Sequence, residues 1–306
     1  MTVVKYRNLY DTVGFQNQQI FKRLYTTKKF LCDEFIYGGH WLSLGASALV
    51  LSTMLLLRIP IRWEFLIVAY LCGLIIYGYD RYKDVAIDSV NNAKRANHLK
   101  KYYRFIPFIF MGYGIAYFVL LLYFGTMESV LFGGVLVLIG ILYTHRLKKL
   151  TTKIVGFKNY YTSFSVALSV VFTALYCSYQ LNWLLLILFV FLFLRMMIDC
   201  SFCDIKDMDE DRKHKLLTFP VVCGKDRFLT ILHIMNVVAC FPIIIGVVLH
   251  VLPLFSLCIL ISSFYSFYFI QKARYEQTDI RSLISYVVDG EFTVWPLLLF
   301  FGGILA

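Results

Sequence analysis

Apolar residues are gathered along the chain in long runs, and shorter polar segments separate one run from the next. A helix needs about 20 consecutive apolar residues to cross the hydrocarbon core of a membrane. Runs of about this length occur nine times, at residues 39–57, 63–79, 105–124, 127–144, 160–178, 181–199, 228–249, 251–270 and 285–305. The pattern predicts an all-α integral membrane protein with nine transmembrane helices, in which a polar N-terminal arm (1–38) precedes the membrane domain (39–306).

The composition favours lipid as the solvent of this fold. Of the 306 residues, 59% are hydrophobic and 16% are charged, and the mean hydropathy is +0.70. Soluble globular chains are only about 45–50% apolar. Five of the eight cysteines fall singly in or near apolar runs, where a thiol behaves as a small hydrophobe. Cys200 and Cys203 form a CxxC, but without a second pair or a nearby histidine it predicts neither a zinc site nor a redox site.

The basic residues indicate which side of the membrane each polar segment faces. Of the 30 Lys and Arg residues, 27 lie in the N-terminal arm and after the second, fourth, sixth and eighth runs. Positive segments face the cytoplasm, or its equivalent in an organelle. We therefore expect the N-terminus and the long loops on the cytoplasmic side and the C-terminus on the other. Such residues also bind anionic lipid headgroups, so the net charge of +11 requires no nucleic-acid partner, and no obligatory protein partner is indicated.

Nine of the 19 acidic residues lie in two clusters, each of which follows an apolar run. Residues four apart lie on nearly the same face of a helix, where like charges repel each other. The plain alternative is a solvated polar face, balanced in the first cluster by Arg81, Lys83 and Lys94. The clusters are Asp80, Asp84 and Asp88, and then Asp199, Asp204, Asp207, Asp209, Glu210 and Asp211.

The spacing of the clusters indicates an internal repeat. Asp84 and Asp207 are 123 residues apart, and Asp88 and Asp211 are separated by the same number. The first pair follows the second apolar run and the second pair follows the sixth. We therefore expect two four-helix units that each bring a DxxxD to the cytoplasmic mouth of the bundle, followed by a ninth helix. The loops after these runs are long for connections and are expected to cap the active-site cavity.

Two pairs of carboxylates around one cavity require positive charge between them. Mg²⁺ prefers oxygen ligands and is commonly bound by one or two carboxylates together with substrate phosphates. The clusters therefore predict a site for Mg²⁺ and a phosphate or diphosphate. Cationic residues that follow the two clusters, or that lie on the loop between the fourth and fifth runs, could bind the same anion. They are Arg95, Arg146, Lys148, Lys158, Arg212 and Lys213.

At this point the residues resemble a known family, the UbiA superfamily of intramembrane prenyltransferases, over residues 39–305. The first motif of that family reads NDxxDxxxD followed by NxPxRP. In this sequence the corresponding stretch is DRYKDVAIDSVNNAKR. The positions that match are Asp80, Asp84, Asp88, Asn91 and Arg95.

The second motif is the more specific one. In the chlorophyll-synthase and homogentisate-prenyltransferase branches it reads DIxDxEGDRxxGxxTLPVxxG, and residues 204–224 read DIKDMDEDRKHKLLTFPVVCG. The stretch YTHRLKK at 143–149 is similar to the family's signature at the end of helix four. Asp80 replaces an Asn, Ala93 and Ala96 replace prolines, and Glu210 replaces a Gly, which together imply a divergent branch.

The resemblance implies a role for each position. Asp84 and Asp88 would hold one Mg²⁺, and Asp207 and Asp211 another, and both would bind the diphosphate of an isoprenoid donor. Positive charge there favours ionisation of the allylic C–O bond. The residues implied to bind the diphosphate are Asn91, Arg95, Lys148, Arg212, Lys213 and Tyr143, and those implied for catalysis are Asp80, Asp204 and Lys148.

The function predicted from this resemblance is a Mg²⁺-dependent prenyltransferase of isoprenoid biosynthesis with a lipophilic, aromatic acceptor. The prenyl tail would lie among the helices, lined by some of the 28 Phe and 22 Tyr residues, although ordinary packing is the plain explanation of each ring. A terpene cyclase of the same fold, acting on the diphosphate alone, is the alternative. A cation transporter fits less well, because the acids gather at one mouth rather than at the midplane.

Other polar residues favour plain structural explanations. Arg195 and Asp199 are spaced i, i+4, which predicts an ion pair within one helix. An ion pair with Arg81 is an alternative for Asp80, and one with Lys206 for Asp204.

Overall fold

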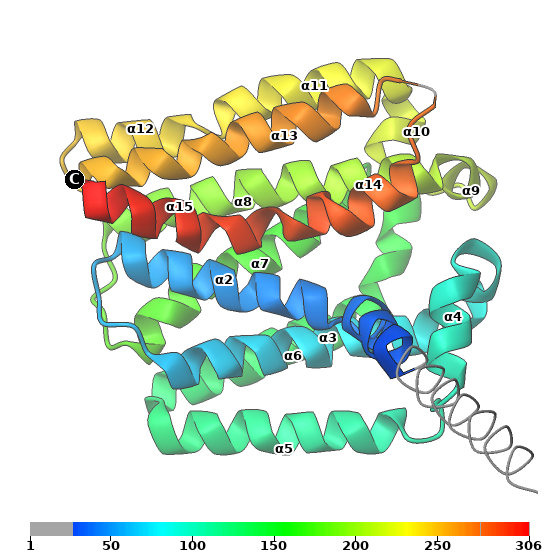
Figure 1. Cartoon of the computed structure of the whole chain (residues 1–306), viewed down its shortest axis with the longest axis horizontal. Helices are drawn as coiled ribbons and strands as arrows, with labels where there is room; N and C mark the ends of the chain where they lie inside the picture. Colours follow the sequence, from blue (N-terminus) through cyan, green and yellow to red (C-terminus); the bar gives the residue numbers. More distant parts are fainter. Residues whose placement is uncertain (1–26, 276, 306) are drawn as a thin grey trace, which may run out of the picture.

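The computed structural model describes residues 27–305 except residue 276, so most of the expected N-terminal arm lies outside the described residues. Every regular element in the described part is helical, and the long helices lie roughly parallel to one another (Figure 1). The end of the arm forms a helix, Thr27–Tyr37. The first half of the chain then forms α2 (His40–Leu56), α3 (Trp63–Asn91), α4 (Ala93–Lys100), α5 (Ile106–Phe124), α6 (Met127–His145) and the 3₁₀ helix η1 (Leu147–Thr152).

The second half of the chain adds further long helices and several short ones. Its first long helices are α7 (Phe157–Tyr176) and α8 (Trp183–Cys203). They are followed by η2 (Asp204–Asp207), α9 (Met208–Lys213), α10 (Phe219–Cys223), α11 (Lys225–Val238), α12 (Phe241–Val248), η3 (Leu254–Leu260), α13 (Ile261–Lys272), α14 (Ile280–Tyr286), η4 (Val288–Gly290) and α15 (Glu291–Leu305).

The chain is an integral, multi-pass membrane protein, as its apolar runs predicted. In the described residues, seven helices are long and apolar enough to cross a membrane, and Thr27–Tyr37 with α2 forms an eighth candidate bent by 54°. The seven are Trp63–Ala86, Ile106–Phe124, Met127–His145, Trp183–Lys213, Lys225–Val248, Leu254–Lys272 and Ile280–Ile304. Each of the nine expected ranges overlaps a helix, but α7 is not among these candidates, since its first turns read KNYYTS. The count of nine and the repeat of two four-helix units therefore stay predictions.

The last three expected spans are not single regular helices. Residues 228–249 divide between α11 and α12, residues 251–270 between η3 and α13, and residues 285–305 between α14, η4 and α15. Proline explains the first break, because Pro242 stands in the first turn of α12 and cannot donate a backbone hydrogen bond.

Two glycines allow close packing around α3. A Cβ atom on Gly78 would lie 2.6 Å from the ring of Phe110 on α5, and one on Gly140 of α6 would lie 2.7 Å from Ile76 on α3. The helix α3 therefore packs tightly against both α5 and α6. This packing brings the last turns of α3, which contain the first acid cluster, beside the end of α6.

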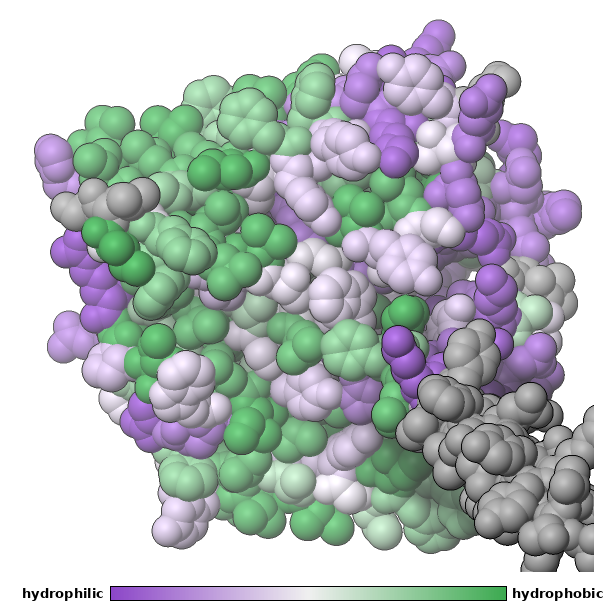
Figure 2. All heavy atoms as spheres, viewed as in Figure 1, coloured by the Kyte–Doolittle hydropathy of each residue, from purple (hydrophilic) through white to green (hydrophobic). Residues whose placement is uncertain are grey.

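Polar residues gather at one end of the bundle. Figure 2 shows an apolar surface over most of the visible face and a hydrophilic region at one end, where Figure 1 places α4 and α9. The C-terminal end of the chain lies at the opposite end of the bundle (Figure 1). The long loops after α3 and α8 thus contain short helices, α4 and α9, on one side, as expected for loops that cap a mouth.

Candidate active site

The first acid cluster occupies the last three turns of α3. The ammonium group of Lys148 on η1 contacts the Oδ2 atom of Asp84 and lies 3.7 Å from the Oδ1 atom of Asp80. The hydroxyl of Thr144, near the end of α6, donates a hydrogen bond of 3.1 Å to Asp80. Lys148 thus places one positive charge beside two of the three carboxylates, and it reaches them because α6 packs against α3.

The third aspartate of this cluster is held from the loop. The Arg95 guanidinium binds both oxygens of Asp88, with Nε 2.8 Å from Oδ2 and Nη2 2.5 Å from Oδ1. Asn92 caps α4 by accepting a hydrogen bond from the backbone N–H of Arg95. Such forked pairs fix geometry as well as charge. Asn91 is the last residue of α3, but its side chain lies outside the described residues.

The second acid cluster is bound from the start of α7. Lys158 Nζ lies 2.6 Å from Asp204 Oδ1 and 3.9 Å from Asp211 Oδ2, and the Asn159 amide donates a hydrogen bond of 2.9 Å to Asp204 Oδ2. Lys158 precedes the apolar part of α7. Burial opposes its charge, but the carboxylates of Asp204 and Asp211 outweigh burial and raise the pKa of Lys158. The lysine therefore stays protonated at neutral pH.

A glycine turn aims Lys158 at this cluster. Gly156 precedes α7 with φ +65°, a left-handed conformation that favours glycine. Its N–H donates to the carbonyl of Leu217, and the N–H of Leu217 donates to the carbonyl of Thr151. A Cβ atom at position 156 would lie 2.3 Å from the ring of Phe219. The loop after α6 is thereby fastened to the loop that contains the second cluster.

Both clusters lie at the same end of the bundle. Tyr143 on α6 is within electrostatic range of Asp80, of Asp204 and of Lys158, and its ring stacks on Tyr161 at 5.2 Å. Asp289 in η4 is likewise within electrostatic range of Arg81, Arg95 and Lys206. The segment from α6 to α7 supplies one lysine to each cluster and Tyr143 between them.

Some of the predicted residues do not join these contacts. Arg212 and Lys213 are exposed on α9, and in the described residues neither forms an ion pair. No hydrogen bond or ion pair is recorded for the carboxylate of Asp207 in the described part of the chain. One oxygen of Asp211, Oδ2, is buried and accepts no hydrogen bond there. Oδ2 of Asp211 thus has only the longer, 3.9 Å ion pair with Lys158.

Two ion pairs considered from the sequence do not form. Asp80 is paired with Lys148 rather than Arg81, whose Nη1 atom donates to the carbonyls of Ile36 and Tyr37. Asp204 is paired with Lys158 rather than Lys206. The reason is the same in both cases, since a residue from another element lies closer than the sequence neighbour.

The expected ion pair between Arg195 and Asp199 is also wrong. The Arg195 side chain turns into the bundle, where its Nη2 atom contacts Glu291 of α15 and Ser266 of α13. Its Nη1 atom donates to Asn236 of α11. Both oxygens of Asp199 are buried without a hydrogen bond.

Sequence reasoning missed part of the second cluster. Lys158 was expected only as a nearby cation. Neither its ion pair with Asp204 nor the hydrogen bond from Asn159 to Asp204 was predicted. The available signal is the Lys-Asn pair at the start of the fifth apolar run, because two such polar residues need partners where a helix enters lipid.

The acids at this end fit a hard cation, although they do not form a complete cage. Within the described residues, no three acidic, His or Cys side chains converge closely enough to hold a metal by themselves. Mg²⁺ rarely needs such a cage, because it keeps waters and binds one or two carboxylates with substrate phosphates. Oδ2 of Asp211, which accepts no hydrogen bond in the described residues, is an oxygen ligand of the kind that such an ion prefers.

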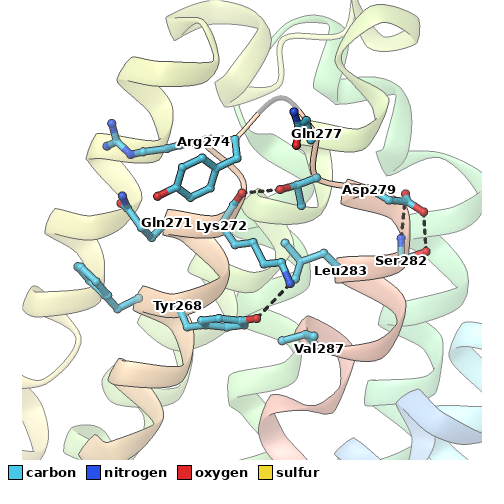
Figure 3. Close-up of a pocket in the computed structure, with 12 residues that line it drawn as sticks. Tyr268, Gln271, Lys272, Arg274, Gln277, Asp279, Ser282, Leu283 and Val287 are labelled. Atoms are coloured by element: carbon cyan, nitrogen blue, oxygen red, sulfur yellow. Dashed lines mark hydrogen bonds between the residues drawn. The ribbon is translucent and has the colours of Figure 1, made fainter.

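A separate groove contains none of the predicted site residues. It lies between α13 and α14, has a volume of about 1170 Å³ and opens beside Lys272, whose Nζ atom is 3.1 Å from the hydroxyl of Tyr268 (Figure 3). Its lining includes Leu283 of α14 and Val287, which directly follows α14. The candidate active site is therefore distinct from this groove.

Comparison with known proteins agrees with the fold. Residues 40–295 match the profile of the UbiA prenyltransferase family. No curated protein sequence matched the chain significantly.

Three solved structures have the same fold. A UbiA homolog from Aeropyrum pernix K1 aligns with a TM-score of 0.65 and 15% identity, over 86% of this chain and 97% of that one. A UbiA homolog from Archaeoglobus fulgidus bound to GPP and Mg²⁺ aligns with a TM-score of 0.64 and 11% identity, over 88% and 98%. A structure described for the biosynthesis of digeranylgeranylglyceryl phosphate synthase in membranes aligns with a TM-score of 0.56 and 16% identity, over 91% and 100%.

At these identities the likeness to the solved structures concerns the fold, whereas the family profile covers most of the chain. The chain belongs to the UbiA prenyltransferase family.

Proposed function

We propose that this protein is a Mg²⁺-dependent intramembrane prenyltransferase that ionises a polyprenyl diphosphate and transfers the prenyl group to a lipophilic, aromatic acceptor. The observation that carries the proposal is the arrangement of charge at one end of the bundle. Two acid clusters lie there, and a single segment supplies Lys148 to one and Lys158 to the other. The Archaeoglobus relative, which was solved with GPP and Mg²⁺, supports the same assignment.

The carboxylates are the proposed metal ligands. Asp84 and Asp88 would hold one Mg²⁺, and Asp207 and Asp211 another. When bound there, the ions would supply positive charge that stabilises the diphosphate as it leaves. Asp84 is now neutralised by Lys148, and Asp88 by Arg95, so both carboxylates already sit beside a cation that a diphosphate could also use.

The cationic residues are the proposed diphosphate ligands. Lys148, Lys158 and Arg95 contact the acid clusters now, and anionic phosphate oxygens would offer them stronger partners than single carboxylates. Asn91 and Tyr143 would donate hydrogen bonds to the same anion. Arg212 and Lys213 stay proposed as outer ligands, which requires that α9 move toward the mouth when substrate binds.

The transfer step releases a proton that a carboxylate of this chain would accept. The allylic C–O bond breaks with its electron pair on the diphosphate, and a carbon of the acceptor then bonds to the prenyl carbon and loses its proton. Asp80 and Asp204 are the proposed bases. Asp204 is the more sheltered of the two, since its side chain is 3% exposed and Asp80 is 35% exposed.

The membrane surrounds the apolar part of both substrates. The prenyl tail would lie among the helices and the polar head at the end that contains α4 and α9. We place this end and the N-terminus in the cytoplasm, or its organelle equivalent, because the basic residues gather there. Labelling of Lys213 by a membrane-impermeant amine reagent, in sealed vesicles of known orientation, would test which side of the membrane this end faces.

Product analysis tests the proposed reaction. The purified protein would be incubated with geranyl, farnesyl and geranylgeranyl diphosphates, with and without lipid extract from the source membrane, and the products identified by mass spectrometry. A prenylated product that forms only with extract supports the transferase. A cyclised hydrocarbon or alcohol without extract would replace it with a terpene cyclase. Metal flux in liposomes without any diphosphate release would replace it with a transporter.

A further inference from the structure

The helix before the membrane domain lies against the loop of the candidate site. The family profile begins at residue 40, so the helix Thr27–Tyr37 is outside the matched range. This helix runs beside α4, the short helix that follows the first acid cluster (Figure 1). Its contacts with α4 are made by side chains.

Glu34 makes the central contact. Its Oε2 atom lies 2.6 Å from Nε2 of His98 on α4 and accepts a hydrogen bond of 2.7 Å from the hydroxyl of Tyr102. Its Oε1 atom lies 3.6 Å from Nε2 of His40. The His98 ring is 2% exposed and also packs against Phe30 at 5.2 Å. One carboxylate thus joins the N-terminal helix to His98 in the last turn of α4 and to Tyr102 just after it.

The same helix is fixed to α3 at its C-terminal end. Arg81 of α3 donates through Nη1 to the carbonyls of Ile36 and Tyr37, at 3.2 and 2.9 Å. The chain then bends at Gly38 and Gly39. A Cβ atom on Gly38 would lie 2.3 Å from Oε1 of Glu34, and Gly39 has φ +102°. A glycine at both positions therefore allows the chain to bend while Glu34 keeps this position.

The helix α4 depends on such contacts for its position. It has only eight residues, and a helix of this length is not stable in isolation. His98 lies one turn after Arg95 on the same helix, and Arg95 holds both oxygens of Asp88. Anything that fixes His98 also fixes the arginine over the first acid cluster.

From these contacts we propose that Glu34 is a positioning residue for the prenyl diphosphate site. Through His98 and Tyr102 it holds α4 so that Arg95 stays at Asp88, where the diphosphate head would bind. The proposal rests on the function proposed above for Arg95. It assigns the N-terminal helix, which the family profile does not include, to the assembly of the site.

The test compares Glu34→Gln with Asp33→Asn, a neighbouring carboxylate for which no contact with α4 is recorded in the described residues. In Glu34→Gln we expect KM for geranyl diphosphate to rise about tenfold, the scale of one lost charged hydrogen bond, while kcat changes less than twofold. We also expect faster hydrogen exchange of residues 93–100, measured in nanodiscs without substrate. Asp33→Asn should match the unmodified protein in both measurements.

A double variant identifies the contact. Because Glu34 acts through His98 and Tyr102, Glu34→Gln should add little to the KM of a His98→Gln, Tyr102→Phe protein. Equal KM and equal exchange in Glu34→Gln and Asp33→Asn would overturn the proposal. If the unmodified protein releases no diphosphate, the proposed function fails instead, and the exchange of α4 still decides whether Glu34 positions this helix.

Discussion

The ammonium group of Lys158 lies 2.6 Å from the carboxylate of Asp204, which is 3% exposed. The lysine begins one long helix and the aspartate follows the next, so the pair fastens the second acid cluster to the segment that also supplies Lys148 to the first. In this structure three cations proposed to bind substrate, Arg95, Lys148 and Lys158, are paired with carboxylates of the acid clusters.

Removal of Lys158 is expected to impair both folding and turnover. In Lys158→Met, the buried carboxylate of Asp204 loses its cation, and breaking a buried pair costs about 3–5 kcal/mol; because Lys158 is 24% exposed, the lower end of this range is expected. Thermal unfolding in detergent and the rate of diphosphate release would measure the two effects. Lys158→Arg, which keeps the charge, should recover most of the stability. Equal stability of Lys158→Met and the unmodified protein would argue against the pair.

The turn before α7 is expected to tolerate no side chain. Gly156→Ala places a Cβ atom against Phe219 and in a left-handed conformation, which costs about 1–2 kcal/mol for the backbone alone. Turnover should fall with stability, since Lys158 is two residues away. Gly112→Ala is the matched control, because a Cβ atom there meets nothing within 4 Å. Similar melting temperatures for the two variants would show that the turn is not constrained.

The buried pair of Arg195 and Glu291 gives a third prediction. Both side chains are at most 1% exposed, so Glu291→Ala leaves a guanidinium unpaired inside the bundle, at a cost of about 3–5 kcal/mol. Replacing both residues, as Arg195→Met with Glu291→Leu, should restore much of that loss because neither charge of the pair stays buried. Unfolding of the three proteins in the same detergent measures this. A double variant less stable than Glu291→Ala would contradict the explanation.

The pH at which the N-terminal helix detaches follows from Glu34. Burial opposes its charge, but bonds from His40, His98 and Tyr102 outweigh burial and lower its pKa from 4.5 to about 2. Tyr113 on α5 also lies within electrostatic range of it. A lowered pKa gives stability that is complete above pH 4.5 and is lost as the pH falls toward 2. Limited proteolysis near residue 38 should increase only in that window, and Glu34→Gln should remove the dependence. Release already at pH 6 would be inconsistent with it.

The sequence alone predicted the features that depend on local spacing. The four-residue steps place Asp80, Asp84 and Asp88 along one helix, and the structure has all three in α3. Long apolar runs predicted membrane helices because lipid leaves the backbone few other choices. Lys148 was expected at the site as a ligand of the diphosphate, but its pairing with Asp84 was not predicted.

Contacts between distant parts of the chain could not be predicted in the same way. Arg195 has an acid one turn away, yet its partner Glu291 lies 96 residues further on. Which of the two it binds depends on how α15 packs against α8, and no local pattern encodes that. The contact of Glu34 with His98 is hidden for the same reason, since 64 residues separate them.

Metal-dependent release of diphosphate tests the central claim most directly. The unmodified protein in nanodiscs would be given geranylgeranyl diphosphate with Mg²⁺ or with EDTA. It would be compared with a variant in which Asp84, Asp88, Asp207 and Asp211 are all Asn, and with Asp226→Asn, a change of an exposed aspartate on α11. We expect release that requires Mg²⁺, persists in Asp226→Asn and falls at least about 100-fold in the fourfold variant, the scale for lost electrostatic stabilisation of a transition state. Two results would contradict the assignment of these carboxylates as magnesium ligands. One is undiminished diphosphate release from a folded fourfold variant, and the other is release at the same rate in EDTA as in Mg²⁺.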